Sequence, residues 1–359
     1  MASAFSLPEE DLAFIHSTLG VRTQALNGDV LVTGANGFFG RWVVEALVWM
    51  RQKCAVPISV HVLLRDAPRF LAEAPSSVTN GVHVISGEME ASIATRAKFK
   101  HIIHLASPLI RPNDVSAFHA HMHIAARGMD QILELARDAG DCTVLFTSSG
   151  AIYGDYLGVT PARRPYEENF TGEPASFLNE KLIYGQTKRY LELLLLTSGA
   201  RHGFSTRIAR CFSFIGPYLP LDSNYAIGNF MRNALDGKSI VIEGDGKVRR
   251  SYMYAADMVI ALLAILLDGR NGAAYNVGAS RAYSLLEVAH LVAAQVPGCA
   301  VEVLNRALST GAGAEYVPDL FLFERDFGGL PAQPIEQAIR KTLMWHHASG
   351  GALARRQAN

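Results

Sequence analysis

The chain has 359 residues, 49% of them hydrophobic and 18% charged, which suits a globular protein of one large or two interleaved domains. Lys plus Arg and Asp plus Glu each total 33, so the formal net charge is zero. A neutral chain has no field that draws it to nucleic acid or an acidic membrane, and we expect neither as a partner. The cysteines are scattered and the N-terminus has no basic-then-apolar signal pattern, so we expect a cytoplasmic protein.

Short apolar runs alternate with longer amphipathic segments from residue 29 onward, and residues 1–27 before them predict an accessory N-terminal helix. This alternation is typical of a parallel sheet covered by helices on both faces. The expected strands are 29–33, 58–64, 82–86, 101–105, 142–147, 204–210 and 274–277. The expected helices are 38–51, 116–139, 180–200, 225–236, 255–267 and 284–295.

The first expected strand runs into a glycine-rich turn. Residues 29–40 read Asp-Val-Leu-Val-Thr-Gly-Ala-Asn-Gly-Phe-Phe-Gly, and an apolar helical pattern follows. Glycine lets the backbone turn sharply and approach a phosphate, and the following helix offers free N–H groups. An ordinary turn is the alternative, but between strand and helix the pattern indicates a dinucleotide-binding site. The expected contacts are Gly34, Asn36, Gly37, Phe38, Phe39 and Gly40.

This beginning predicts an α/β fold, a Rossmann-type doubly wound parallel sheet with a smaller, interleaved C-terminal lobe. We expect the dinucleotide-binding domain to span 28–215, with 251–280 returning to it. In 216–250 and 281–345 strand signals become intermittent, so these segments are expected to form the second lobe. We expect 346–359 to be a flexible tail.

The end of the second strand, Leu64-Arg65-Asp66, bears on the choice of cofactor. An acid here takes the ribose hydroxyls of NAD, whereas an arginine accommodates the 2′-phosphate of NADP. Arg65 can bind that phosphate or stack its plane on adenine. We expect NAD, because the reaction favoured below regenerates its own cofactor, and NADP stays open.

A serine-bearing strand end and a Tyr-Lys helix carry the expected chemistry. Ser149 follows a buried strand, and Tyr184 and Lys188 share one face of an apolar helix. A lysine ammonium and an oxidised nicotinamide both favour phenolate, which lowers the tyrosine pKa towards neutrality. Tyr-x-x-x-Lys alone is a common accident, but the order of glycine turn, serine and Tyr-Lys pair indicates a dehydrogenase-type centre.

From about Asp29 to Trp345 these motifs resemble the extended short-chain dehydrogenase/reductase family, particularly its NAD-dependent nucleotide-sugar epimerases, dehydratases and decarboxylases. Ser149, Tyr184 and Lys188 match the family's catalytic triad. The cofactor contacts expected beside the glycine turn are Arg65, Asp66, Glu88, Met89, Leu105, Ala106, Ser107, Tyr184 and Lys188.

The same resemblance implies a nucleoside-diphosphate sugar as the substrate. Residues 208–217 resemble the crossing to a sugar-nucleotide-binding lobe, and 244–251 resemble a stretch that holds diphosphate and nucleoside. Arg250 is the preferred phosphate contact, because a guanidinium matches phosphate geometry. The expected substrate contacts are Ser107, Ser149, Gly150, Ala151, Ser213, Asn229 and Arg250.

Three departures from the family's pattern bear on the reaction. The 4,6-dehydratases of the family carry an Asp-Glu pair directly after the catalytic serine or threonine, and the decarboxylases keep the glutamate. Here the two positions are Gly150 and Ala151, which supply neither acid nor base. Ser213 and Ala125 stand where the family usually has a substrate-binding and a network-supporting asparagine.

An intact triad without the Asp-Glu pair predicts a 4-epimerase, in which Tyr184 deprotonates the C4 hydroxyl and tightly held NAD⁺ takes and returns the hydride. An NADPH-dependent reductase of 4-keto sugars would use the same triad and suit Arg65. A 4,6-dehydratase or decarboxylase would need another carboxylate. A non-enzymatic dinucleotide sensor is the alternative from a different class.

Three further features bear on metal binding, on a loop and on assembly. His119, His121 and His123 fall at a helix start, where residues two apart diverge, so we expect solvated side chains and no metal site. Glu167 and Glu168 are expected to be solvated in a loop. The apolar faces of helices 116–139 and 180–200 exceed what one sheet face needs, and they predict a symmetric homodimer.

Overall fold

Seven parallel strands form the central sheet of the described residues, in the order β11-β6-β5-β4-β1-β2-β3. They are β1 (Gly28–Thr33), β2 (Ile58–Leu64), β3 (Val82–Ser86), β4 (His101–His104), β5 (Thr143–Ser149), β6 (Ser205–Cys211) and β11 (Ala273–Val277). All seven were expected from the sequence, and the α/β doubly wound fold class is confirmed. The structure is a computed structural model that describes residues 7–88, 91, 93–107, 115–154, 165–169, 182–222, 225–304, 315–329 and 332–349.

The strand order reverses between β1 and β4, and this reversal places the site. In an open parallel sheet, ligands bind beyond the carboxyl ends of the strands at such a point. Here the two strands end at Thr33 and His104, which are paired in register. Thr33 Oγ1 lies 2.8 Å from Nδ1 of His104, and both residues are buried, so this pair closes the floor of the crevice.

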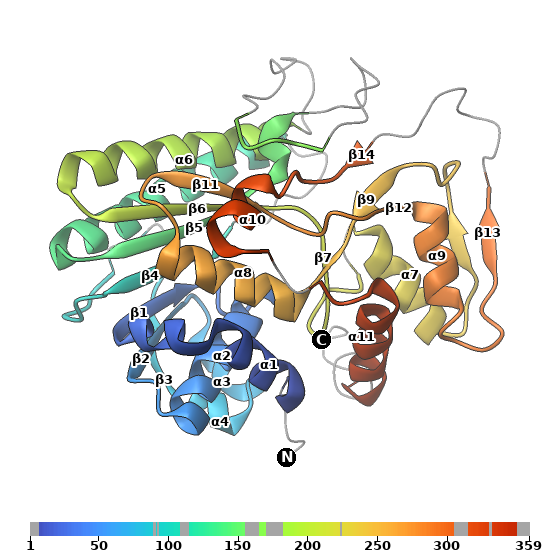
Figure 1. Cartoon of the computed structure of the whole chain (residues 1–359), viewed down its shortest axis with the longest axis horizontal. Helices are drawn as coiled ribbons and strands as arrows, with labels where there is room; N and C mark the ends of the chain where they lie inside the picture. The colour runs from blue at the N-terminus through green and yellow to red at the C-terminus, as the bar shows by residue number, and fades with distance from the viewer. Residues whose placement is uncertain are drawn as a thin grey trace.

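Helices cover both faces of the sheet (Figure 1). On one face lie α5 (Val115–Ala139) and α6 (Leu182–His202), and on the other α1 (Glu9–Leu19), α2 (Phe38–Cys54) and α8 (Ala255–Asp268). Every residue of α8 from Ala255 to Leu266 is buried, because the helix packs against α1, α2 and the sheet at once. The connecting helices are η1 (Gly20–Leu26), α3 (Ala67–Glu73) and α4 (Ser76–Thr79). None of the helices in the described part of the chain combines the length and hydropathy that crossing a bilayer requires.

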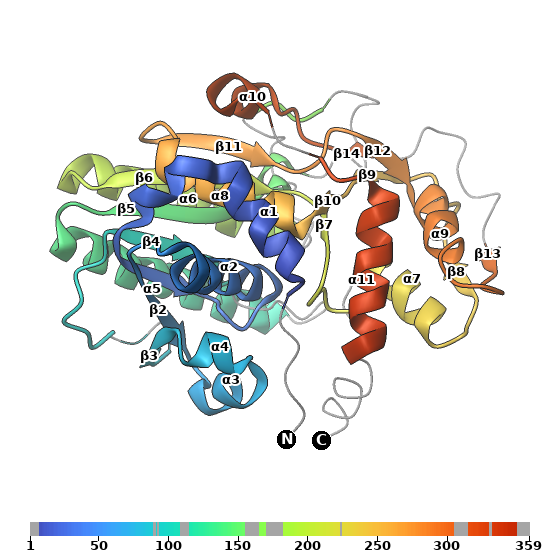
Figure 2. The same ribbon diagram turned by 60° about the horizontal axis from the view of Figure 1, so that its bottom comes forward.

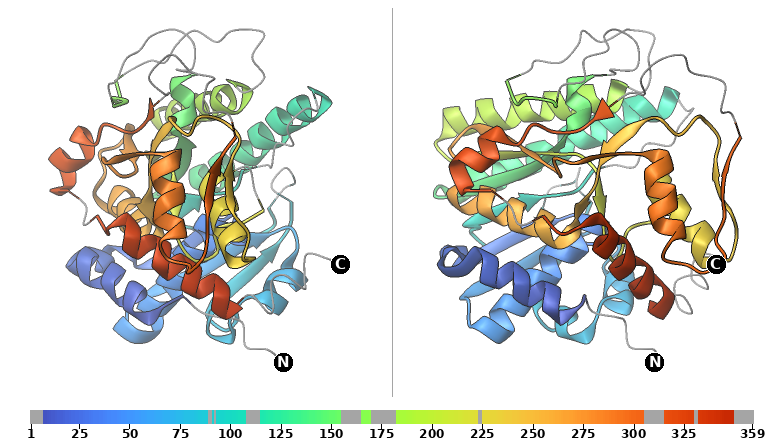
Figure 3. Two further views of the ribbon diagram at one scale, coloured as in Figure 1. Left: turned by 90° about the vertical axis from the view of Figure 1, so that its right-hand side faces the viewer. Right: turned by 45° about the vertical axis from the view of Figure 1, so that its right-hand side comes forward.

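A smaller group of elements follows the chain's exit from the sheet at β7 (Phe214–Ile215), which pairs with β10 (Met253–Tyr254) (Figure 3). β9 (Arg249–Ser251) pairs with β12 (Ala282–Ser284) and β14 (Glu315–Tyr316), and β8 (Ile240–Ile242) with β13 (Val301–Val303). The helices here are α7 (Ala226–Leu235), α9 (Leu285–Ala293) and α11 (Ile335–Ser349), while α10 (Phe321–Phe327) contacts β11.

The described chain ends in the helix α11, which was not among the helices expected from the sequence. α11 continues to Ser349, so a flexible tail beginning at 346 is wrong for residues 346–349. The reason is packing: Ser349 is buried, and its hydroxyl donates to the Trp345 carbonyl oxygen at 2.7 Å. Residues 350–359 lie outside the described part of the chain.

The N-terminal helix α1 packs on α8 and is tied to distant elements by a buried carboxylate (Figure 2). Asp11 is only 1% exposed. Its Oδ2 accepts a 2.6 Å hydrogen bond from the Tyr254 hydroxyl, and its Oδ1 accepts from Lys341 Nζ in α11. A buried charge is tolerated only when it is paired, so α1 is a structural member of the fold.

Candidate active site

The glycine turn forms a cradle from which side chains are excluded. Gly34 has φ +73°, a conformation that L side chains rarely adopt, and a Cβ there would lie 2.7 Å from the Ala106 backbone nitrogen. A Cβ on Gly40 would lie 2.1 Å from the Gly34 carbonyl oxygen. The Gly37 N–H donates to that same oxygen at 2.9 Å. This close backbone packing is what a dinucleotide pyrophosphate needs in order to approach the chain.

The helix behind the turn has an N-terminus suited to an anion. Gly37 is the N-cap of α2 and makes no side-chain cap hydrogen bond. The backbone N–H groups of the first helical turn are therefore oriented towards a ligand in the crevice. Asn36 and Gly37 are exposed beside them, whereas the Phe39 ring packs on Phe214 with ring centroids 5.0 Å apart. These residues fit NAD, whose pyrophosphate the backbone from Gly34 to Gly40 would hold.

The residues that follow β2, β3 and β4 were expected to contact the cofactor, and one of them has a structural role. Asp66 caps α3, because its carboxylate accepts the Arg69 N–H at 2.9 Å, while Arg65 stays exposed beside it. Glu88 is exposed shortly after β3, and Met89 lies outside the described residues. After β4, the Ala106 N–H donates to Thr33 Oγ1 at 3.2 Å. Leu105 and Ala106 are half-buried and Ser107 is exposed at this strand end.

The structure brings the three expected catalytic residues together with Ser107. Ser149 ends β5, and Tyr184 and Lys188 lie in the first turns of α6. Ser107 and Ser149 both act on the Tyr184 hydroxyl and lower its pKa, so the two serines lie beside it. Lys188 Nζ donates to the Thr147 carbonyl oxygen at 2.9 Å and lies 5.8 Å from the centroid of the Tyr184 ring.

Burial determines the charge state of the Tyr-Lys pair. It raises the pKa of Tyr184, and the two serine hydroxyls offset this only in part. Burial also lowers the pKa of Lys188 to about 8, although Cys211 and Glu192 pull it back upwards. The Tyr-x-x-x-Lys spacing predicted a tyrosine pKa near neutrality, and in the protein alone the shift has the opposite direction. A positive charge beside the phenol is still required to favour the phenolate.

Ser149 is followed directly by the short helix η2 (Gly150–Tyr153), against which α6 packs. A Cβ on Gly185 would lie 2.2 Å from the Ala151 carbonyl oxygen, so the start of α6 rests on the η2 backbone. A Cβ on Gly150 would lie 2.5 Å from the Tyr316 hydroxyl. Positions 150 and 151 thus bring no acid or base to the centre, and Tyr316, which the sequence did not point to, lies there.

The expected substrate contacts lie around this centre and in the smaller lobe. Arg250 is exposed on β9, and its guanidinium lies 5.6 Å from the centroid of the Tyr316 ring, which places it next to the expected catalytic side chains. Ser213 precedes β7, where its carbonyl oxygen accepts the Met253 N–H at 3.0 Å. Asn229 is half-buried within α7. Of these three, the structure brings Arg250 to the catalytic centre.

A buried polar network supports the site from below and corrects one expectation. Arg210 in β6 forms two hydrogen bonds with the Glu192 carboxylate in α6, at 2.8 and 3.1 Å. Arg210 also donates to the Glu168 carbonyl oxygen at 2.8 Å. Glu168 Oε1 accepts the Asn276 N–H at 3.1 Å, and burial raises the pKa of this carboxyl. The expectation that Glu168 is solvated is therefore wrong, because segment 165–169 packs on β6 and β11.

His121 is also buried, although its side chain was expected to be solvated. It lies within α5 but is only 4% exposed, with its ring centroid 6.4 Å from that of Tyr184. Burial and the nearby Lys188 lower its pKa, so the imidazole stays neutral. Among the described residues, no group of three or more His, Cys, Asp or Glu side chains is placed to hold a metal ion.

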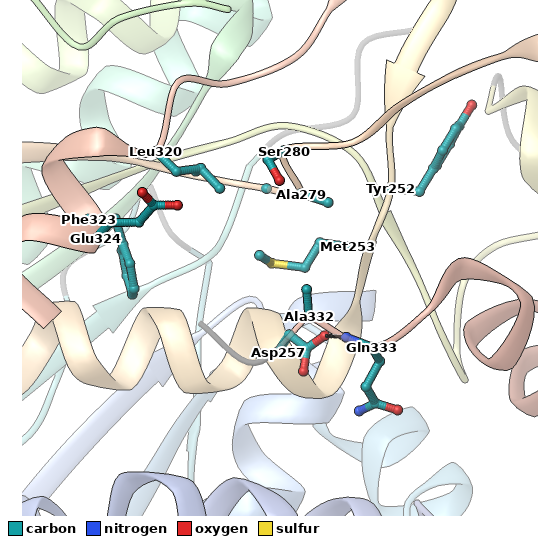
Figure 4. Close-up of a pocket in the computed structure, with 11 residues that line it drawn as sticks. Tyr252, Met253, Asp257, Ala279, Ser280, Leu320, Phe323, Glu324, Ala332 and Gln333 are labelled. Carbon is teal, nitrogen blue, oxygen red and sulfur yellow. Dashed lines mark hydrogen bonds between the residues drawn. The ribbon is translucent and has the colours of Figure 1, made fainter. Parts of the chain in front are cut away.

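A separate small cavity of about 70 Å³ lies over the N-terminus of α8, lined by residues that include Met253, Asp257, Phe323 and Gln333 (Figure 4). Asp257 is 1% exposed, and its Oδ2 accepts the Gln333 N–H at 2.9 Å. Its Oδ1 has no hydrogen-bond partner within the described residues. Burial raises the pKa of Asp257 to about 7.

This carboxyl predicts a pH-dependent loss of stability. The pKa of Asp257 is higher in the folded than in the unfolded protein. Ionisation of this carboxyl therefore lowers the free energy of unfolding as the pH rises from about 4 to about 7. The difference in free energy of unfolding between Asp257→Asn and wild type should therefore shift in favour of the variant by about 2 kcal/mol from pH 5 to pH 8. Urea denaturation at both pH values measures this difference, and a gain that is equal at both would contradict it.

Asp326→Asn is the matched control. Hydrogen bonding with Arg325 is the largest cause that lowers the pKa of Asp326, to about 2. A depressed pKa gives stability that is present above the unfolded value of about 4 and is lost only as pH falls towards 2. Between pH 5 and pH 8, the effect of this substitution should therefore stay constant.

Comparison with known proteins places the chain in a family. The sequence model of the "NAD dependent epimerase/dehydratase family" matches residues 30–278, more than half of the chain. UDP-glucuronic acid decarboxylase 1 of Xenopus tropicalis is 26% identical over 315 residues, which cover 88% of this chain and 71% of the relative. UDP-glucuronic acid decarboxylase 6 of Arabidopsis thaliana is 27% identical over 273 residues, which cover 74% of each chain.

Solved structures show the same fold. UDP-glucose 4-epimerase of Thermotoga maritima aligns with a TM-score of 0.72 and 19% identity, covering 89% of this chain and 99% of its own. dTDP-glucose 4,6-dehydratase of Bacillus anthracis aligns with a TM-score of 0.68 and 19% identity, covering 90% and 98%. The family match confirms the resemblance found in the sequence and the expectation of an NAD-dependent enzyme. The chain belongs to the NAD-dependent epimerase/dehydratase family.

Proposed function

We propose that this enzyme is a 4-epimerase of a nucleoside-diphosphate sugar. The proposal is carried by one observation: Ser149, Tyr184 and Lys188 lie close together. The two positions beside them, Gly150 and Ala151, supply no acid or base. Removing and returning one hydroxyl proton needs the triad alone, whereas elimination needs a further acid and base at the sugar. The likeness to a UDP-glucose 4-epimerase supports this reaction class.

Each triad residue has a separate task in this proposal. Bound NAD supplies a hydride acceptor that gives the same hydride back, so no cofactor is consumed. Tyr184 accepts the proton of the C4 hydroxyl and later returns it. Ser149 donates a hydrogen bond to that same oxygen. Lys188, held by the Thr147 carbonyl oxygen, favours the tyrosine phenolate through its positive charge.

We further propose that the smaller lobe binds the nucleoside diphosphate. Its segments would be 216–250 and 281–345, while 28–215 with 251–280 would hold NAD. Arg250 is the proposed phosphate contact, supported by its exposed position on β9 next to Tyr316. Ser213 and Asn229 are proposed to line the path between the catalytic centre and the nucleotide, and Ser107 and Ser149 to contact the sugar.

The test is an assay with UDP-, dTDP-, GDP- and CDP-hexoses and no added cofactor. We expect the purified protein to bring one pair of C4 epimers to equilibrium, which proton NMR of the sugar detects directly. Mass spectrometry of nucleotides that copurify with the protein should identify the base and should find NAD. A protein that interconverts none of these sugars would contradict the proposal.

Assays with further substrates separate the alternative reactions. The two relatives named above are UDP-glucuronic acid decarboxylases, and with UDP-glucuronic acid added as a substrate, release of CO₂ would indicate that reaction despite the methyl side chain of Ala151. A 4-keto-6-deoxy product would indicate a dehydratase. Stoichiometric consumption of NADPH would indicate a 4-keto-sugar reductase, for which the exposed Arg65 is the supporting feature.

We also propose a cytoplasmic homodimer in which α5 and α6 form the interface. Met122 and Leu193 on these helices are 40% and 59% exposed, and large apolar side chains of this kind favour association. All four cysteines are free thiols, which suits a reducing compartment. Light scattering after gel filtration should give a dimer mass, and Leu193→Glu should shift it towards the monomer.

A further inference from the structure

Tyr316 brings a third hydroxyl to the catalytic serine from the far end of the chain. Its hydroxyl lies beside the catalytic serine, since a Cβ on Gly150, the next residue after Ser149, would be 2.5 Å from it, and Ser149 and Tyr184 both act on its pKa. Tyr184, Arg250 and Cys211 are the titratable groups that act on Tyr316. Burial is the largest cause that shifts its pKa, and it raises the pKa above the ordinary value. The phenol therefore stays protonated and is available as a hydrogen-bond donor.

The backbone around Tyr316 is fixed on both sides, so this placement is a built feature. β14 pairs with β9, with Tyr316 opposite Arg250. The Tyr166 N–H donates to the Val317 carbonyl oxygen at 3.0 Å, and the Asp319 N–H donates to the Tyr166 carbonyl oxygen at 2.9 Å. The Phe212 ring then holds the Tyr316 ring, with centroids 4.7 Å apart.

Gly150 leaves room for this phenol. A Cβ at position 150 would lie 2.5 Å from the Tyr316 hydroxyl and 2.8 Å from the Phe212 ring. Any other residue there would displace Tyr316 from Ser149, because real Cβ atoms do not approach heavy atoms so closely. The position that lacks an acid in the sequence is thus filled in space by a tyrosine hydroxyl.

The hydrogen bonds of Ser149 determine where its own proton points. A serine hydroxyl has one proton to donate and two lone pairs that accept. One lone pair accepts the Ala151 N–H at 3.1 Å. If the protonated Tyr316 hydroxyl takes the other, both lone pairs are occupied. Ser149 then acts only as a donor, and its proton is left for the oxygen of Tyr184 or of the sugar.

We propose that Tyr316 is a positioning residue of the reaction: it donates to Ser149 and so leaves the Ser149 proton free to be donated to Tyr184 or to the reacting sugar oxygen. This inference rests on the proposed function, since it assigns the Ser149 proton a role in that reaction. Tyr316 acts through Ser149, and the predicted effects below follow from that dependence.

Tyr316→Phe in the full-length protein removes the donor and keeps the ring that packs on Phe212. We expect kcat to fall about tenfold, less than a directly acting acid–base residue costs, with KM and NAD content unchanged. In a Ser149→Ala background the same substitution should change kcat by less than about twofold, because the group it orients is gone. Full activity of the single variant, or additive losses in the double variant, would overturn the inference.

Tyr275→Phe is the matched control, because it also removes a buried tyrosine hydroxyl. Tyr275 lies in β11, and its hydroxyl donates to Asp326 Oδ2 in α10 at 2.8 Å rather than to a group beside Ser149. We expect it to lower Tm without lowering kcat. Tyr316→Phe should instead lower kcat without lowering Tm. This difference separates a positioning role from a structural one.

The inference and the proposed function fail separately. If wild type interconverts no sugars, the proposed function fails, and Tyr316 is tested without turnover by ultraviolet titration of NAD-loaded protein. The part of the phenolate absorbance that disappears in the Tyr184→Phe variant is the signal of Tyr184. In Tyr316→Phe its midpoint should rise by about half a pH unit, because the phenolate loses an oriented donor. An unchanged midpoint would overturn the role of Tyr316.

Discussion

Replacing Tyr184 by phenylalanine is expected to lower kcat by about a thousandfold, the loss of a group that carries the proton in the rate-limiting step. The ring stays in place, so Tm and NAD content should be those of wild type. The hydroxyl lost is the one that lies beside Ser107 and Ser149, and these serines cannot replace it as a base. Initial rates of epimer interconversion, measured with saturating sugar nucleotide, give the result.

Tyr190→Phe is the control on the same helix. Tyr190 lies in α6 and is 45% exposed in the single chain, unlike the Tyr184 hydroxyl, which is buried, so removal of the Tyr190 hydroxyl should leave kcat within about twofold. A Tyr184→Phe variant as active as this control would show that Tyr184 carries no proton. It would also revive the non-enzymatic sensor as an explanation of the fold.

Gly40→Ala is expected to abolish NAD retention and to lower stability by about 3 kcal/mol or more, because the added carbon cannot be accommodated by side-chain movement. Its Cβ would lie 2.1 Å from the Gly34 carbonyl oxygen and 2.6 Å from the Ala35 Cα, both backbone atoms. Relief requires α2 to move away from the turn that presents the pyrophosphate site. Thermal melting and the NAD released on denaturation measure the two effects.

Gly37→Ala gives a graded comparison within the same turn. Gly37 has φ −78°, which alanine adopts readily, and its Cβ would lie 3.3 Å from the Gly34 carbonyl oxygen. We expect this variant to fold with a small loss of Tm and to bind NAD more weakly. Equal effects of the two substitutions would contradict the argument from close backbone approach.

The sheet could be predicted because burial on both faces leaves a local signature. β4 is buried throughout, β1 is buried from Val30 to Thr33, and their neighbours β2 and β5 are largely buried. Strand ends were predicted less well. β5 continues to Ser149, two residues beyond the predicted end, because it pairs with β6 up to Cys211. That extension brings Ser149 to the crevice as part of the sheet.

The triad could be predicted because Tyr184 and Lys188 are one helical turn apart and Ser149 ends an apolar run. Tyr316 could not, since it lies in a two-residue strand whose position depends on pairing with β9. Asp66 carried a readable signal, a cap residue with proline in the first helical turn. The motif alone contains no information about burial, which raises the pKa of Tyr184 in the protein alone, whereas the expected lowering of that pKa is for the complex with an oxidised nicotinamide.

Asp11 and Lys341 also restrict the order in which the protein matures during synthesis. Asp11 emerges from the ribosome early, while Lys341 lies 330 residues further along the chain. Until that cation arrives, the Asp11 carboxylate cannot be both buried and neutralised by Lys341, and a buried unpaired charge is strongly unfavourable. Nascent chains that end before α11 should therefore keep α1 undocked and accessible to protease, even after the strands of the sheet have been made.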